Sequence, residues 1–245
     1  MAAPRFFSRV ALARDVTETL VELDETIAHH ATRVLRLGAG DALTLFDGGG
    51  GEFDAILERV DKRGAVARVL RFVSVERESP LAVTLAQAIT ANDAMDSAIR
   101  KATELGVTSI QPLVTARSAP LPSGERGDKR LAHWRHVAIA GCEQCGRNRV
   151  PDVAPPQPFP EWLSGWTGSG ILFLPGARQS VTTIAQPAAP LALLIGPEGG
   201  FDAREALAAQ AKGFHALGLG PRVLRSETAA TAGLAIVQAA WGDWR

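Results

Sequence analysis

The chain has 245 residues, of which 46% are hydrophobic, and it carries 26 basic and 26 acidic side chains. This length fits one large domain or two modest ones, and the apolar fraction excludes a wholly disordered chain. No stretch reaches the ~18 consecutive apolar residues of a membrane span. The two cysteines argue against a disulfide scaffold, and Arg9 and Arg14 interrupt the N-terminus where a signal peptide would be apolar. These features predict a cytoplasmic protein with no membrane segment.

The first 75 residues have the pattern of a small β-barrel. Short runs with partial period-two alternation are separated by turn signals, and Asp47-Gly48 followed by further glycines predicts a hairpin. One short helix is expected over residues 26–35. Residues 76–80 are charged and end at Pro80, which predicts a linker. The strand-like runs are PRFFSRV, TLVEL, DALTLFD, GEFDAILERV and AVARVLRFV.

From residue 81 onward, predicted strands and helices alternate. Residues 81–89 form a near-continuous apolar run, which is typical of a strand buried on both faces. The alternation predicts an α/β domain over residues 81–245, with a mostly parallel sheet covered by helices on both faces. Further strands are expected at 109–114, 171–174, 191–195 and 215–219, and a helix at 128–145.

Helix-boundary signals sharpen this interpretation of the second domain. Asn92 and Ser226 are expected to be N-caps, and Asp202 with Glu205 has the spacing of a capping box. Gly106 is placed to end the helix that begins near Asn92.

Common catalytic motifs are absent from the sequence. It contains no Gly-Lys pair for a P-loop, and no GxGxxG, HExxH or GxSxG. Cys142 and Cys145 form a lone C-x-x-C without the second ligand pair that a structural zinc site needs. They also lie near the end of a predicted helix, which favours packing over thiol chemistry. No metal site is predicted.

Two glycine-rich loops, each directly after a predicted strand, are the informative features. The first is IGPEGGF at 195–201, and the second is LGLGPRVLRSET at 217–228. Ligands of open α/β sheets bind beyond the carboxyl ends of the strands, where glycine lets the backbone approach a ligand closely. The pair of loops is therefore a candidate site for a nucleoside-like ligand, although each one alone could be an ordinary strand-to-helix turn.

These residues match a known family. GPEGGF and the later LGLGPRVLRSETA closely resemble the C-terminal motifs of the RsmE-type methyltransferases of the SPOUT superfamily, the bacterial 16S rRNA uridine N3-methyltransferases. Collinear resemblances run through most of the chain: RFF at 5–7, HHATRVLRLGAGD at 29–41, KATELGVTSIQPL at 101–113 and EQCGRNRVP at 143–151.

The resemblance implies a PUA-like N-terminal barrel and a C-terminal α/β SPOUT domain with a deep trefoil knot. It also implies a homodimer and S-adenosylmethionine as the cofactor, with small-subunit rRNA or the assembled small subunit as the partner. The implied cofactor-binding residues are Gly196, Pro197, Gly199, Gly200, Leu217, Gly218, Leu219, Arg222, Leu224, Ser226 and Thr228.

The chemistry of such a reaction suggests roles for particular side chains. Uracil N3 must lose its proton before it attacks a methyl group, so an arginine that stabilises the developing anion and a carboxylate that accepts the proton are useful. Arg225 and Glu198 are the candidates for these two catalytic roles. The candidate RNA-binding residues are Arg5, Arg9, Arg33, Arg36, Arg147 and Arg149.

Two other functions remain open at this level. A SPOUT enzyme with another RNA substrate, such as tRNA or 23S rRNA, would share the knot. A non-catalytic RNA-binding protein would keep the barrel but would not be expected to keep the glycine loops, which are intact here.

Overall fold

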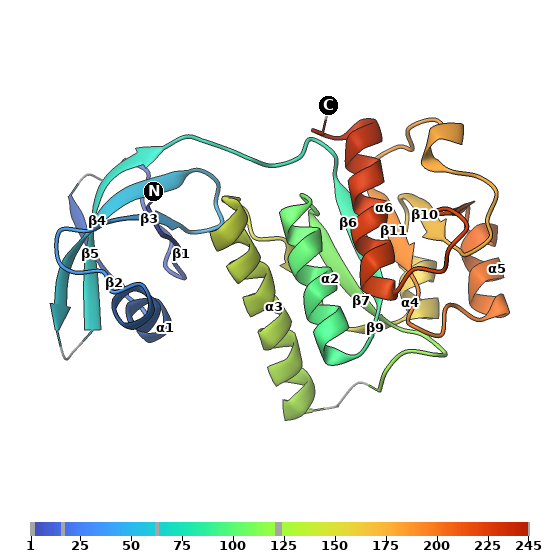
Figure 1. The fold of residues 1–245 in the computed structure, drawn as a ribbon, viewed down its shortest axis with the longest axis horizontal. Helices are drawn as coiled ribbons and strands as arrows, with labels where there is room; N and C mark the ends of the chain where they lie inside the picture. Colours follow the sequence, from blue (N-terminus) through green and yellow to red (C-terminus); the bar gives the residue numbers. More distant parts are fainter. Residues whose placement is uncertain (1–2, 16–17, 62–63, 121–123, 245) are drawn as a thin grey trace. The chain divides into compact units, whose positions relative to one another are not determined.

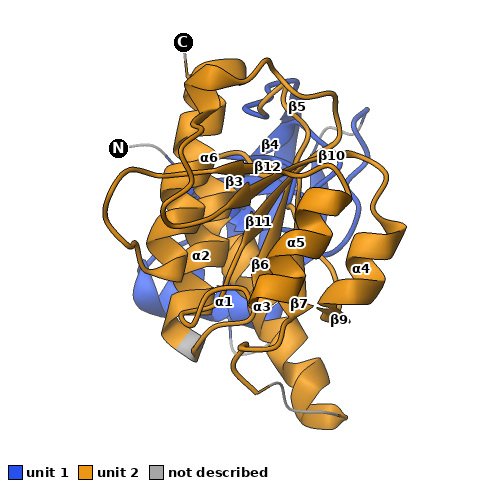
Figure 2. Cartoon of the chain, turned by 90° about the vertical axis from the view of Figure 1, so that its right-hand side faces the viewer, with its two compact units in different colours: residues 1–78, 142–150 blue, residues 79–141, 151–245 orange. Residues whose placement is uncertain are grey.

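The computed structural model describes residues 3–15, 18–61, 64–120 and 124–244. Within it the chain divides into two compact units, coloured separately in Figure 2. Unit 1 contains residues 1–78 and 142–150, and unit 2 contains residues 79–141 and 151–245. This division differs from the predicted boundaries in two respects: residues 76–78 of the expected linker belong to unit 1, and so does the distant segment 142–150.

Unit 1 is built on a five-stranded sheet in the order β1-β3-β4-β5-β2 (Figure 1). β1 and β3 are parallel, and the other neighbours are antiparallel. The predicted hairpin is confirmed, because β3 and β4 pair across the turn that follows Asp47. The strands are β1 (Arg5–Phe7), β2 (Thr19–Leu23), β3 (Ala42–Phe46), β4 (Glu52–Asp61) and β5 (Gly64–Val73).

The core of unit 1 includes the inward-facing residues of β4 and residues of a short helix. Phe53, Ala55 and Leu57 on β4 are buried, while the residues between them are not fully buried, as period two requires. The predicted helix is present as α1 (Glu25–His29), capped by Asp24, and continues as the π-helical turn η1 (His30–Val34). Ile27 and Ala28 of α1 pack into the same core.

Unit 2 contains a wholly parallel sheet in the order β12-β10-β11-β6-β7-β8, with β9 also paired to β7. β6 and β11 are buried nearly throughout because helices cover both faces. The strands are β6 (Val83–Ala88), β7 (Ser109–Val114), β8 (Asp152–Val153), β9 (Gln157–Pro158), β10 (Ser169–Phe173), β11 (Leu191–Ile195) and β12 (His215–Leu217).

Figure 2 shows α2 and α6 on one face of this sheet and α4 and α5 on the other. α3 packs against α2, where a Cβ on Gly141 would lie 3.1 Å from the Cβ of Thr103. α4 was not predicted from the sequence; its Phe159, Trp162 and Leu163 join a core cluster that includes buried residues of the sheet strands. The helices are α2 (Asn92–Glu104), α3 (Glu125–Cys145), α4 (Phe159–Gly165), α5 (Ala203–Ala211) and α6 (Ser226–Trp241), with a 3-10 turn η2 (Val181–Thr183).

One predicted cap is wrong, and one is confirmed. α6 begins at Ser226 itself, so Arg225 occupies the N-cap position. α2 begins at Asn92, whose side chain lies outside the described part of the structure, so its predicted capping role stays a prediction. The capping box of α5 is present, with Asp202 accepting from the Glu205 backbone N–H and Glu205 accepting from that of Asp202.

None of the helices in the described residues is long and apolar enough to cross a membrane. The described residues likewise contain no group of three or more His, Cys, Asp or Glu side chains that could hold a metal ion.

Candidate functional site

The loops that follow β10, β11 and β12 meet at one edge of the unit 2 sheet, because the strands are parallel. The loop after β10 lies directly against the end of β12. The backbone N–H of Gly218 donates to the Gln179 carbonyl at 2.8 Å. A Cβ on Gly218 would lie 2.4 Å from the Ala177 carbonyl oxygen, so only glycine allows this approach.

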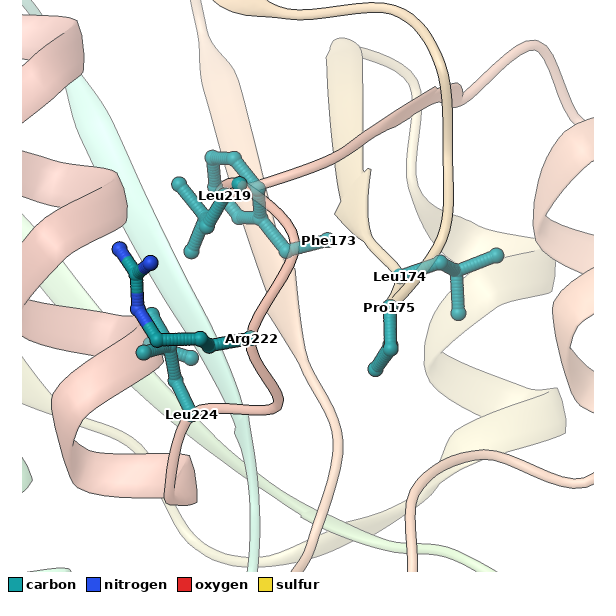
Figure 3. A pocket seen from close by; sticks show the side chains of 8 residues that line it. Phe173, Leu174, Pro175, Leu219, Arg222 and Leu224 are labelled. Atoms are coloured by element: carbon teal, nitrogen blue, oxygen red, sulfur yellow. The ribbon is translucent and has the colours of Figure 1, made fainter.

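An open pocket lies between these two loops (Figure 3). Its lining is mainly apolar, and the Arg222 side chain lies at one wall. Leu219, Arg222 and Leu224 were predicted as cofactor-binding residues. Leu174 and Pro175, which follow β10 directly, line the opposite wall and were not among the residues predicted from the sequence. The signal was present as a Leu-Pro-Gly turn at the end of a buried strand. The lining residues are Phe173, Leu174, Pro175, Leu219, Gly220, Arg222, Leu224 and Ala229.

The loop after β11 is tied to the start of α6. The Ser226 hydroxyl donates to the Gly196 carbonyl oxygen at 2.6 Å. Pro197 is buried, and its carbonyl accepts from the backbone N–H of Gly200 at 2.8 Å. Gly200 has φ +67°, which favours glycine. The structure therefore brings three of the predicted loop residues together with Ser226, which explains why this hydroxyl is not a cap.

The segment after β7 also holds the loop after β11, through contacts that were not predicted from the sequence. The Arg117 guanidinium donates to the Gly199 carbonyl at 2.8 Å. A Cβ on Gly199 would lie 3.3 Å from the Arg117 Cβ, so the arginine side chain covers this glycine. The neighbouring Ala116 backbone N–H donates to Glu205 at 2.8 Å.

The two predicted catalytic residues have different surroundings. Glu198 is exposed, and its Oε1 accepts from the Ala91 backbone N–H at 3.1 Å. Arg225 is exposed at the N-cap of α6, and in the described part of the chain its guanidinium makes no hydrogen bond or ion pair. Leu217 is fully buried at the end of β12, and Thr228 is exposed on the first turn of α6.

The six candidate RNA-binding arginines fall into two groups. Arg9, Arg33, Arg36 and Arg149 are exposed, and the nearest carboxylates of Arg9 and Arg149 are 3.7 Å away. Arg5 and Arg147 have side chains that are only 13% and 5% exposed. The placement of Arg5 and Arg147 therefore does not support the prediction that these two arginines contact RNA.

Both buried arginines hold unit 1 together. Arg5 forms an ion pair with Glu52 and donates to the Asn148 side chain at 2.6 Å. Arg147 donates to Glu78 at 3.1 Å. Burial raises the pKa of Glu52, but hydrogen bonds from Arg77 and Arg5 outweigh it, so that pKa lies below its ordinary 4.5.

Cys142 of the C-x-x-C pair lacks the exposure and the lowered pKa of a reactive thiol. Cys142 is fully buried, and both cysteines are free thiols. Burial raises the pKa of the Cys142 thiol to about 12, so it is protonated at neutral pH. This agrees with packing as its role.

Comparisons with known proteins identify the class of protein to which this chain belongs. Residues 77–238 match the model of the RNA methyltransferase domain, and residues 23–70 match that of the RNA methyltransferase PUA domain. The chain is thus an RNA methyltransferase with an N-terminal PUA-like domain.

Individual relatives identify the family within this class of RNA methyltransferases. A Synechocystis protein named ribosomal RNA small subunit methyltransferase E is 36% identical over 94% of this chain and 76% of that protein. The crystal structure of such an enzyme from Neisseria gonorrhoeae, bound to S-adenosyl methionine, is 36% identical with TM-score 0.91 and covers 100% of both chains. A Legionella pneumophila methyltransferase solved with the bound cofactor SAM is 37% identical with TM-score 0.94, covering 99% of this chain and all of that one. The chain belongs to the ribosomal RNA small subunit methyltransferase E family.

Proposed function

We propose that this protein transfers a methyl group from S-adenosylmethionine to N3 of a uridine in the 16S rRNA of the small ribosomal subunit. The observation that carries the proposal is the pocket between the loops after β10 and β12, in a chain aligned over its whole length with a relative crystallised with S-adenosyl methionine. The membership of the chain in the small-subunit methyltransferase family supports the choice of rRNA.

The residues of the pocket fit this cofactor. Phe173, Leu219 and Leu224 offer an apolar surface of the kind an adenine ring needs, and Arg222 is a charged donor suited to a carboxylate. The missing Cβ of Gly218 keeps the two loops in contact. The proposed binding set also includes Ser226 and the 196–200 loop. When bound, the cofactor supplies an electrophilic methyl group.

The protein's own part in the reaction is to activate the base. Arg225 has an exposed guanidinium that can stabilise negative charge on a uracil carbonyl oxygen as N3 loses its proton. The Glu198 carboxylate keeps one oxygen without a backbone donor in the described structure and is exposed, so it can accept that proton. Since N3 lies on the pairing edge of the base, the target uridine must be unpaired or flipped out.

RNA is held by exposed cations of unit 1 in this proposal. Arg9, Arg33, Arg36 and Arg149 are available to phosphates, while Arg5 and Arg147 support the unit from within. The domain limits proposed from the sequence, 1–75 and 81–245 with a linker at 76–80, and the trefoil knot are part of the same proposal.

We also propose that the protein acts as a homodimer in the cytoplasm. Ile236, in the C-terminal half of α6, is 40% exposed, and Trp244, just beyond the helix, is 53% exposed, which suits a two-fold apolar contact. Light scattering at micromolar concentration is expected to give twice the monomer mass of 25.9 kDa. A stable monomer would contradict this part of the proposal.

The test of the function is mass spectrometry of RNA from a strain that lacks the gene. One N3-methylated uridine is expected to disappear from 16S rRNA and to return when the purified protein and S-adenosylmethionine are added. If the missing methyl group lies in tRNA or 23S rRNA, the substrate is wrong. If none is missing and calorimetry detects no S-adenosylmethionine binding, a non-catalytic RNA-binding protein is the better description.

A further inference from the structure

A glutamine at the carboxyl end of β6 lies beneath the proposed cofactor loops. Gln87 is fully buried between apolar residues of the strand. Its side-chain N–H₂ donates to the Ala88 carbonyl at 2.8 Å and to the Ser226 hydroxyl at 2.9 Å. A carbonyl oxygen can only accept a hydrogen bond, so the Gln87 atom that faces the Ala88 carbonyl must be the amide nitrogen. This contact therefore settles the orientation of the Gln87 amide.

Gln87 belongs to a relay that joins three separate chain segments. Because the Ser226 hydroxyl accepts from Gln87, its own proton is directed to the Gly196 carbonyl, 2.6 Å away. The relay therefore connects the end of β6, the start of α6 and the first residue of the glycine loop after β11. Gln87 and Ser226 are 139 positions apart along the chain, and Ser226 and Gly196 are 30 positions apart.

The second polar atom of the Gln87 side chain, Oε1, argues against a purely structural role for this residue. Its Oε1 is buried and has no hydrogen-bond partner among the described residues. A buried acceptor without a partner carries an uncompensated desolvation cost, which an apolar side chain would avoid. Stability alone therefore gives little reason for glutamine at this position.

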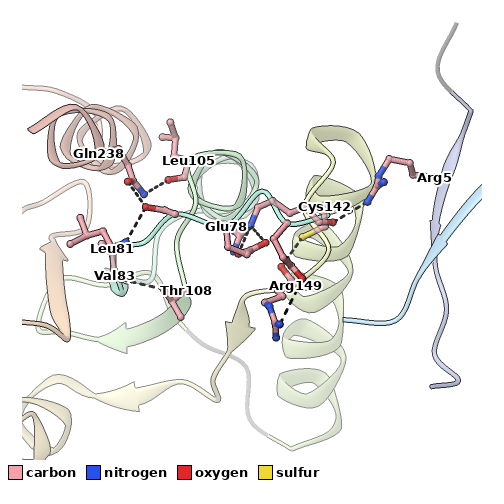
Figure 4. Close-up of polar contacts among 12 residues, drawn as sticks. Arg5, Glu78, Leu81, Val83, Leu105, Thr108, Cys142, Arg149 and Gln238 are labelled. Atoms are coloured by element: carbon pink, nitrogen blue, oxygen red, sulfur yellow. Dashed lines mark hydrogen bonds and ion pairs between the residues drawn. The ribbon is translucent and has the colours of Figure 1, made fainter. Parts of the chain in front are cut away.

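Gln238 provides the comparison within the same unit. It is also fully buried, but both ends of its amide are paired (Figure 4). Its N–H₂ donates to the Leu105 carbonyl at 2.8 Å, and its Oε1 accepts from the Ser79 hydroxyl at 2.7 Å. This amide lies in the last turns of α6, far along the helix from Ser226, and is accounted for by helix packing.

We infer that Gln87 is a positioning residue for cofactor binding, which acts through the Ser226 hydroxyl to hold the Gly196 carbonyl and the 196–200 loop in the binding conformation. The inference rests on the proposed function, because it assigns the loop to S-adenosylmethionine. Without the relay, the loop samples other positions, and the cofactor must bind the fraction of molecules in which the loop is correctly placed.

The test is calorimetric titration of S-adenosylmethionine into the full-length parent, Gln87→Leu, Ser226→Ala and the double variant. Each single variant is expected to bind about tenfold more weakly, the order expected when one hydrogen bond that holds a binding loop is lost. Both changes interrupt one relay. The double variant should therefore bind S-adenosylmethionine with an affinity no lower than that of the less tightly binding single variant. Gln238→Leu is the matched control: its melting temperature should fall, but its affinity for S-adenosylmethionine should equal that of the parent.

Three results would overturn the inference. Parental affinity in Ser226→Ala would show that the hydroxyl is not the link, even if Gln87→Leu fails to fold. Multiplicative effects of the two changes, giving about a hundredfold loss in the double variant, would show that Gln87 acts independently of Ser226. An equal loss of affinity in Gln238→Leu would assign the effect to general destabilisation. A parent protein that does not bind S-adenosylmethionine would instead refute the proposed function itself, and this inference with it.

Discussion

Replacing Gly218 by alanine tests whether the contact between the loops after β10 and β12 makes the cofactor pocket. The new Cβ would lie 2.4 Å from the Ala177 carbonyl oxygen, whereas ordinary contacts begin at 3.4 Å. The Ala177 backbone must therefore retreat by about 1 Å. This movement also threatens the hydrogen bond from Gly218 to the Gln179 carbonyl.

The expected magnitude follows from the cost of overpacking. Inserting a methyl group into a tightly packed site typically costs ~1–3 kcal/mol. If displacement of the loop absorbs that cost, the affinity for S-adenosylmethionine should fall roughly 5–150-fold, since ~1.4 kcal/mol corresponds to tenfold. The assay is calorimetry, together with thermal unfolding with and without the cofactor.

Gly165→Ala is the matched control for this substitution. Gly165 is the last residue of α4, and a Cβ there would meet no atom within 4 Å. Alanine favours a helix over glycine by up to ~1 kcal/mol, so the control should bind cofactor normally and melt at the same temperature or slightly higher. Parental affinity in Gly218→Ala would refute the assignment of this loop contact to the binding site.

The remaining predictions concern the reaction, the RNA and the acid stability of unit 1. Arg225→Ala should lower the single-turnover rate of methyl transfer at saturating RNA by ~10²–10³, because a donor to a developing oxyanion is lost; an unchanged rate would make Arg225 structural. Arg33→Ala should weaken RNA binding in filter assays and reduce the salt slope by about 0.7–0.9, and an unchanged slope would remove Arg33 from the interface. Glu52→Gln should lower the free energy of unfolding by roughly 1–3 kcal/mol, because the buried Arg5 side chain loses its carboxylate partner. Since Arg77 and Arg5 hold the pKa of Glu52 below 4.5, its contribution to stability is complete above pH 4.5 and is lost as the pH falls through the folded-state pKa. Thermal melts should therefore show a steeper loss in acid for the parent than for the variant, and parallel curves would contradict this.

Local patterns in the sequence were sufficient for most secondary structure. The burial of β6 and β11 on both faces made them continuous apolar runs, and the Asp202–Glu205 box marked α5, because these signals arise within a few neighbouring residues. α4 was missed, although Phe159, Trp162 and Leu163 have helical spacing. Its seven residues are fewer than the window over which such a pattern is convincing.

The glycine loops could also be selected from the sequence as a candidate site, because each follows a strand and parallel strands place their carboxyl ends at one edge. The roles of individual side chains could not be derived in the same way. Ser226 has the residue type and position of an N-cap, but its hydroxyl is drawn to a carbonyl 30 residues earlier in the chain. Arg5 and Arg147 resemble their exposed counterparts in sequence, yet partners 47 and 69 residues away bury them.

The sequence by itself thus determined the order of most elements and the two-part organisation, and it indicated the glycine-rich loops as the candidate site, because these features depend on short-range periodicity and turn chemistry. The tertiary structure alone decided which hydroxyl meets which carbonyl, which cations remain free, and that residues 142–150 join unit 1. Those outcomes depend on contacts between distant segments, and only packing in three dimensions selects among the many partners that each polar group could take.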